Sequence, residues 1–149
     1  TKKTIANDLF FASVEEFLKE GRSVEMTVKG FSMRPFLRNE RDVVVLAPLA
    51  ADAPLRRGMV VLFRYNDKHV LHRYVGEKEG LCVMQGDGNY RIEEFVAREA
   101  VLAYVSKVRL AGGLQFRYDT IGWRRRSALS LVRKRLRTIA LDVKRKICK

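Results

Sequence analysis

Ser32 is the candidate nucleophile of this chain, because its surroundings predict an open turn. It follows a polar–apolar alternating stretch, residues 23–28, and Gly30, and it precedes Pro35. A proline disfavours the α conformation of the preceding residue, so we expect the chain to stay open at Arg34. An open turn can present the Oγ together with free amides, as a serine nucleophile requires. Serine is also a common turn residue, so this segment alone predicts only a turn hydroxyl.

His72 is the candidate base for this serine. It is one of two histidines, and it lies within residues 69–75, a stretch that predicts a strand. Side chains alternate along a strand, so Val70, His72 and Tyr74 are expected on one face and His69 on the other. An imidazole titrates near neutral pH and therefore suits proton transfer. By itself, the pattern favours a structural role for His72, as a sheet residue whose ring is hydrogen-bonded to a neighbouring group.

Two acidic residues are candidates to orient the histidine ring. Asp87 lies between Gly86 and Gly88, which allow positive φ angles or a close approach of the backbone. Asp-Gly is also a common hairpin turn, which is the simpler interpretation of this segment. Glu93 follows shortly afterwards, and its simplest interpretation is a solvated charge. The residues alone do not choose between the two acids.

Taken together, these segments resemble the superfamily of signal peptidases and LexA-like self-cleaving proteins. The resemblance covers residues 24–109 and rests on the order and spacing of five segments. The first contains a Ser-Met-x-Pro box, the fourth would carry the general base, and the last resembles the family's Gly-Asp-x-Asn box. The five segments are residues 30–37, 42–45, 58–63, 70–75 and 85–89.

The residue at the base position distinguishes two branches of this superfamily. Bacterial-type signal peptidases and LexA-like proteins have a lysine there, whereas His72 resembles the endoplasmic-reticulum, archaeal and some bacterial signal peptidases. The resemblance implies that Ser32 is the nucleophile and His72 the general base, with no metal and no cofactor. Asp87 matches the aspartate of the Gly-Asp-x-Asn box, and Glu93 stands nearest to a second family acid. Either could orient His72.

The chain departs from the family pattern beside the serine. Phe31 stands where the family has glycine, and Gly30 stands where it has a small hydroxyl residue. A side-chain donor for the oxyanion is therefore missing, and the backbone amides of Ser32 and Met33 are expected to replace it. Met59 also stands in place of a usual acidic residue. These departures weigh against efficient cleavage of membrane-borne signal peptides, but they leave the Ser-His pair intact.

Two helices and a set of short strands are expected to position these residues. Apolar residues at helical spacing predict a helix over 4–20, where the family has a membrane helix, and Gly21 would stop it. Short strands joined by short turns predict a mostly β fold, a small antiparallel barrel or sandwich-like sheet. The expected strands are residues 23–28, 42–46, 59–65, 69–75, 81–85, 100–109 and 114–118.

The C-terminal part of the chain carries most of the net charge of +13. We divide the chain into an N-terminal helix, 1–22, a signal-peptidase-like β domain, 23–119, and a basic helical tail, 120–149. Residues 124–149 contain eleven Lys or Arg and one acidic residue. Apolar residues form a stripe at helical spacing, opposite to a basic face, so the tail predicts a basic amphipathic helix. The stripe consists of Leu129, Val132, Leu136, Ile139, Val143 and Ile147.

Two roles remain open for this helix. Its stripe could pack on the β domain while its charges are solvated, as in most amphipathic helices. Alternatively, residues 123–148 could bind an anionic membrane surface, with Trp123 at the interface. Nucleic acid is a less supported partner, because no recognition module accompanies the charge.

Cysteines and hydropathy indicate the compartment. Cys82 and Cys148 lie far apart, and no CxxC or CxxH spacing occurs, which argues against a zinc site and against a disulfide scaffold. No apolar run approaches the roughly 20 residues of a membrane helix. We therefore expect a cytoplasmic protein, peripheral to the membrane if the tail binds it.

The sequence therefore predicts a serine endopeptidase of signal-peptidase type that cleaves a leader or secreted peptide or a preprotein. The alternative is a catalytically inactive peptide-binding or regulatory module of the same fold. A self-cleaving repressor ranks last, because the chain lacks a helix-turn-helix domain and the lysine base.

Overall fold

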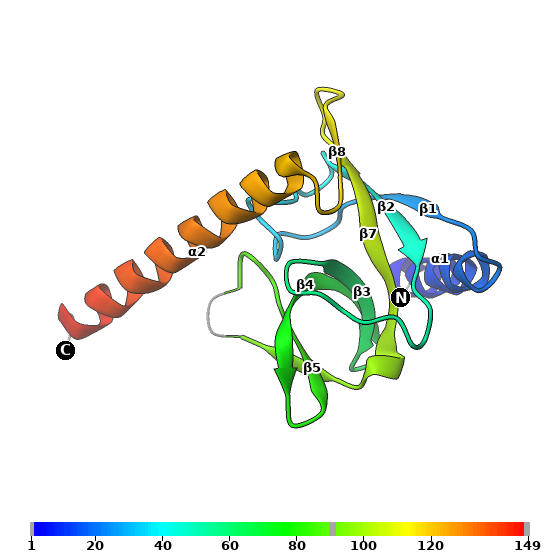
Figure 1. The fold of residues 1–149 in the computed structure, drawn as a ribbon, viewed down its shortest axis with the longest axis horizontal. Coiled ribbons are helices and arrows are strands. Elements are labelled where there is room, and N and C mark those ends of the chain that lie inside the picture. Colours follow the sequence, from blue (N-terminus) through cyan, green and yellow to red (C-terminus); the bar gives the residue numbers. More distant parts are fainter. Residues whose placement is uncertain (1, 90–91, 148–149) are drawn as a thin grey trace.

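The computed structural model has one curled antiparallel sheet, with a helix near each end of the chain (Figure 1). It describes residues 2–89 and 92–147, with side chains from Leu9 onward. The predicted fold class is confirmed: the protein is mostly β, with an N-terminal and a C-terminal helix. The elements are α1 Lys2–Lys19, β1 Val24–Thr27, β2 Val43–Pro48, β3 Val60–Tyr65, β4 Lys68–Lys78, β5 Leu81–Gln85, β6 Glu94–Val96, the 3-10 helix η1 Arg98–Ala100, β7 Val101–Arg109, β8 Gln115–Arg117 and α2 Ile121–Ile147.

The strands pair in the order β1-β2-β7-β3-β4-β5-β6, and β8 pairs with β7. Two-residue turns join β3 to β4 and β4 to β5. The central residues Asn66 and Asp67, and likewise Glu79 and Gly80, have positive φ, which matches the right-handed twist of a hairpin. The hairpin turn predicted at residues 66–68 is confirmed at Asn66 and Asp67, whereas Lys68 already belongs to β4, which extends to Lys78, beyond the predicted end. The short β6 has no counterpart among the predicted strands.

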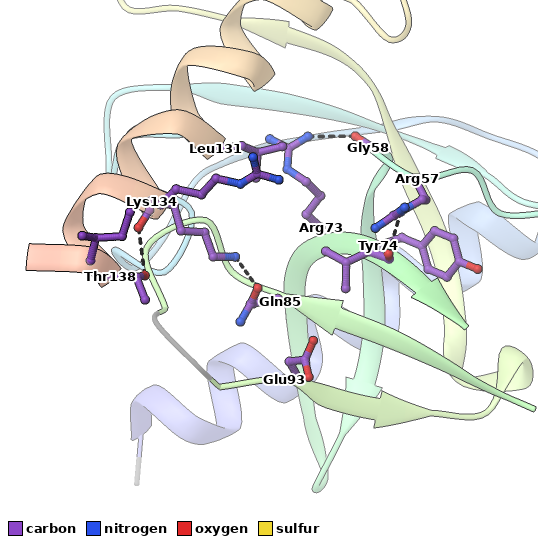
Figure 2. A pocket seen from close by; sticks show the side chains of 12 residues that line it. Arg57, Gly58, Arg73, Tyr74, Gln85, Glu93, Leu131, Lys134 and Thr138 are labelled. Carbon is purple, nitrogen blue, oxygen red and sulfur yellow. Dashed lines mark hydrogen bonds between the residues drawn. The ribbon is translucent and has the colours of Figure 1, made fainter. Parts of the chain in front are cut away.

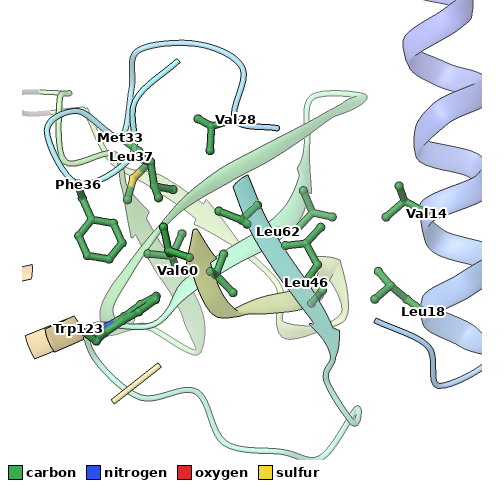
Figure 3. Close-up of a cluster of buried hydrophobic side chains, with 14 residues drawn as sticks. Val14, Leu18, Val28, Met33, Phe36, Leu37, Leu46, Val60, Leu62 and Trp123 are labelled. Carbon is green, nitrogen blue, oxygen red and sulfur yellow. The ribbon is translucent and has the colours of Figure 1, made fainter. Parts of the chain in front are cut away.

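The sheet buries apolar side chains on both faces of its middle strand, β3. Val60 and Leu62 belong to one buried cluster, and Val61 and Phe63 belong to a second. Such a strand appears in the sequence as a continuous apolar run. Figure 3 shows the first cluster, with residues of α1 on one side and Trp123 of α2 on the other.

The helix α2 rests on the sheet with a face that the sequence did not predict. Its buried residues are Trp123, Ser127 and Ser130. The apolar stripe is exposed at every position, so the expectation that it packs on the β domain is wrong. Trp123 is a core residue, packed edge-on against Phe36, and the expectation that it lies at a membrane interface is wrong too. None of the helices in the described part of the chain has the length and apolar character to span a membrane.

Candidate active site

Ser32 and His72 are brought together from the β1–β2 loop and from β4, 40 residues apart in sequence. The Ser32 hydroxyl donates a hydrogen bond to Nε2 of His72, with an Oγ–Nε2 distance of 2.9 Å. His72 is buried, whereas Ser32 is half-buried and so remains accessible. This distance lies within the range expected for a nucleophile and its base.

The acid beside His72 is Glu94, the first residue of β6. The Nδ1–H of His72 donates a hydrogen bond to Oε1 of Glu94, at 2.5 Å, and both side chains are buried. A carboxylate can only accept, so this contact places the ring proton on Nδ1 and leaves Nε2 free to accept a proton. Glu94, His72 and Ser32 therefore form one directed chain of hydrogen bonds.

Neither of the two acids predicted from the sequence contacts the ring. Glu93 is exposed and lies at the edge of a cavity of about 840 Å³ between α2 and the sheet (Figure 2). Asp87 is buried but pairs with Arg73. Glu94 and Val96 point inward from β6 while Phe95 points outward. Recognising this alternation over residues 94–96 would have identified the inward-facing acid.

Gly86 and Gly88 are required because their loop packs tightly against the Ser32 turn. A Cβ at Gly86 would lie 2.5 Å from the Ser32 carbonyl oxygen and 3.0 Å from Nε2 of His72. A Cβ at Gly88 would lie 2.9 Å from the Phe31 carbonyl oxygen. Neither glycine has a positive φ, so close approach explains both. The Gly88 N–H also donates to the Ser32 carbonyl at 2.7 Å, which holds the backbone of Ser32 in place.

The ion pair between Asp87 and Arg73 holds the loop of residues 86–89 in position. Arg73 Nε and Nη2 bind the two Asp87 oxygens at 2.8 and 2.7 Å. The Arg73 side chain is only 1 % exposed, and its guanidinium also lies 4.6 Å from the centre of the Phe36 ring. Alternation along β4 explains this arrangement, because it directs His72 toward Glu94 and Arg73 toward Asp87.

The inner face of α2 completes this ion pair. Ser127 Oγ accepts a hydrogen bond from Arg73 Nη1 at 3.0 Å, and the Ser130 hydroxyl donates to Asp87 Oδ2 at 2.7 Å. Lys134, one turn further, donates to the Gln85 side chain (Figure 2). Burial lowers the pKa of the Lys134 ammonium, and the nearby Asp87 partly opposes this shift. α2 therefore packs against the sheet with its polar face, because the buried Arg73–Asp87 pair needs hydrogen-bond partners there.

Replacing Arg73 with methionine is expected to lower the free energy of unfolding by about 3–5 kcal/mol, because Asp87 would keep a buried charge without its main partner. Urea unfolding measures this change. The matched control is Lys29→Met, since the Lys29–Glu40 pair is exposed and should contribute about 1 kcal/mol or less. Equal losses in the two variants would show that the buried pair does not stabilise the fold.

The backbone amides of Ser32 and Met33 are the oxyanion donors predicted from the sequence. In residues 2–89 and 92–147, neither amide donates a hydrogen bond within the protein. The Gly30 N–H, in contrast, donates to Oδ1 of Asn39 at 2.7 Å, a contact that the sequence did not predict. The hydrogen bond to Asn39 thus fixes the turn at Gly30, while the amides of Ser32 and Met33 remain free to donate to a bound oxygen atom.

A groove of about 640 Å³ lies between β1 and the first half of β4. β1 is an edge strand, and β5 pairs with β4 only from Arg73 onward. His69 and Leu71 of β4 line this groove, as do residues 25–29 and Phe10 and Phe11 of α1. β1 and the first half of β4 thus each have an unpaired edge, and such edges can hydrogen-bond to an extended peptide.

The described residues form no metal site, and comparison with known proteins adds no family. In residues 2–89 and 92–147, no group of three or more His, Cys, Asp or Glu could hold a metal ion. Burial raises the pKa of the Cys82 thiol, and Cys148 lies outside the described residues.

No protein-family model matches the chain, and a search of curated proteins finds no match either.

Proposed function

We propose that the protein is a serine endopeptidase in which Ser32 is the nucleophile, His72 the general base and Glu94 the acid that orients it. The observation that carries this proposal is the chain of hydrogen bonds from Glu94 through His72 to Ser32. A histidine in a sheet can be satisfied by one neighbour. Here both ring nitrogens are engaged, one by a buried carboxylate and one by a half-buried hydroxyl, as acyl transfer requires.

The proposed reaction follows from the proton positions. Ser32 Oγ attacks the carbonyl carbon of the scissile bond while its proton passes to Nε2 of His72. The resulting imidazolium is stabilised by Glu94 and then gives its proton to the leaving amine. Water, deprotonated in turn by His72, attacks the acyl-enzyme and releases the acid product. The amides of Ser32 and Met33 would stabilise the oxyanion in both halves of the reaction.

The proposed substrate is an extended peptide in the groove between β1 and β4. The groove is bordered by the strand that leads to Ser32 and by the strand that carries His72. Main-chain hydrogen bonds to the two strand edges would hold the peptide along β1, which continues into the Ser32 turn, with little dependence on its side chains. A leader or secreted peptide is the proposed substrate because the resemblance to signal peptidases implies it.

The test is covalent labelling with a serine-reactive fluorophosphonate probe, followed by mass spectrometry of the modified peptide. We expect wild type to be labelled on Ser32, and both Ser32→Ala and His72→Ala to lose labelling. The matched control is His69→Ala, because His69 lies in the same strand but bonds Glu15 and stacks on Phe11. This variant should be labelled like wild type.

Equal labelling of wild type and His72→Ala would refute the proposed base. Labelling at a residue other than Ser32 would refute the nucleophile. Specific binding of an extended peptide by a protein that neither reacts with the probe nor cleaves that peptide would favour the inactive peptide-binding module.

A further inference from the structure

The outer face of α2 combines exposed apolar side chains with positive charge. The apolar stripe has exposed fractions of 49–77 %. α2 also carries ten Lys or Arg and one Asp. Monomeric proteins rarely expose a continuous row of large aliphatic side chains to water, so this face indicates a binding surface. The stripe residues are Leu129, Val132, Leu136, Ile139, Val143 and Ile147.

The orientation of this face is set by the opposite side of the helix. Ser127, Ser130 and Lys134 bind the sheet side of the molecule through hydrogen bonds. Trp123 packs in the core. A helix advances by about 100° per residue, so the stripe lies on the side of α2 opposite to these contacts. Figure 1 shows the C-terminal half of α2 extending away from the sheet, and all six stripe residues are exposed.

Cationic side chains border the stripe on both sides. From the helical spacing, Arg133, Arg137 and Lys144 lie along one border. Arg124, Arg135 and Lys146 lie along the other, and all six are exposed. Such side chains can extend toward lipid phosphates while their aliphatic stems cover apolar surface. The same charge opposes pairing of two copies of α2, because each copy would meet a like-charged face.

The surface continues toward the Ser32 turn. A cavity of about 530 Å³ between this turn and α2 is lined by Phe31, Arg34, Arg133, Leu136 and Arg137, among others. Phe31 is itself exposed, although it is a large apolar residue. The apolar and cationic character of α2 thus extends onto the loop that carries Ser32.

We infer that the outer face of α2, with its apolar stripe and two cationic borders, binds the surface of an anionic lipid membrane. The stripe would enter the boundary between headgroups and acyl chains while the Arg and Lys side chains bind lipid phosphates. The helix would lie parallel to the membrane and remain attached to the sheet. This inference does not depend on the proposed peptidase activity.

The test is co-sedimentation of the full chain with vesicles. We expect binding to vesicles that mix phosphatidylserine with phosphatidylcholine, little binding to phosphatidylcholine alone, and weaker binding as salt concentration rises. The double variant Leu136→Ser/Ile139→Ser should bind at least roughly tenfold more weakly. Arg133→Gln/Lys144→Gln should bind roughly 30-fold more weakly. These four positions are exposed, so folding should be unaffected.

Three controls distinguish membrane binding by this face from nonspecific adsorption of the protein to vesicles. Leu114→Ser removes an equally exposed apolar side chain from the loop between β7 and β8, and it should bind vesicles like wild type. Ser32→Ala should also bind normally, whether or not the protein is a peptidase. Trp123 is the only tryptophan, and its fluorescence should not change on binding, because it stays in the core.

The overturning results are equally specific. Unchanged vesicle binding by Leu136→Ser/Ile139→Ser, or equal binding to neutral and anionic vesicles, would refute the proposed surface. A shift in Trp123 emission on binding would show that α2 leaves the sheet and inserts by another face. A dimer in analytical ultracentrifugation that the stripe variant dissociates would assign the face to a second copy of the chain.

Discussion

Replacing Glu94 with glutamine is expected to slow reaction at Ser32 by about 10⁴-fold, the loss typical of a triad acid converted to its amide. The glutamine amide can donate to Nδ1 and so stabilise the tautomer with a proton on Nε2. That tautomer cannot accept the Ser32 proton. Because size and shape are almost unchanged, the fold should be retained. The measurement is the rate of labelling by a fluorophosphonate probe, together with the melting temperature.

The control for this experiment is the adjacent position. Glu93→Gln makes the same chemical change at an exposed residue, so its labelling rate should equal that of wild type. An equal loss in both variants would point to a general effect of acidic charge in this segment. A normal rate in Glu94→Gln would show that the short contact with His72 has no part in activating Ser32.

Replacing Gly86 with alanine is expected to lower the labelling rate by at least about 10²-fold, because reacting groups are sensitive to displacements of about 1 Å. The new methyl group would lie 2.5 Å from the Ser32 carbonyl oxygen and 3.0 Å from Nε2 of His72. The carbonyl belongs to the backbone, so either the turn or the loop must move. We also expect a loss of about 1–3 kcal/mol in the free energy of unfolding, as in other overpacked sites.

Gly112→Ala is the matched control for this substitution. Gly112 has no strained φ and no atom within 4 Å of an added Cβ, so the variant should keep both its labelling rate and its stability. If Gly86→Ala reacts as fast as Gly112→Ala, the close packing of residues 86–89 on the Ser32 turn is not needed for reaction.

The sequence predicted the fold and the contact of Ser32 with His72, but it predicted neither the acid nor the inner face of α2. Periodicity indicates the strands next to Ser32 and around His72, whereas the pairing of the two side chains was predicted only from the resemblance to the signal-peptidase superfamily. Glu94 lies in a strand of three residues, which is too short for a periodic signal. The choice between Asp87 and Glu93 therefore had no geometric basis.

The docking of α2 shows a different limit of sequence analysis. Amphipathic patterns assume that a helix buries its apolar side. Here Ser127 and Ser130 are buried instead, because Arg73 and Asp87 form a buried ion pair with hydrogen-bonding capacity left over. This need for hydrogen-bond partners arises from contacts between segments that are distant in sequence, so a local sequence pattern cannot predict it.

The contact between Ser130 and Asp87 also has a consequence for protein synthesis. Chains emerge from the ribosome N-terminus first, and the segments that carry Ser32, His72 and Glu94 appear well before α2. Until Ser130 emerges, Asp87 lacks one of its partners and the loop against Ser32 is incompletely held. A nascent chain would therefore acquire a fully ordered Ser32–His72 site only after α2 has been synthesised and has packed against residues 86–89.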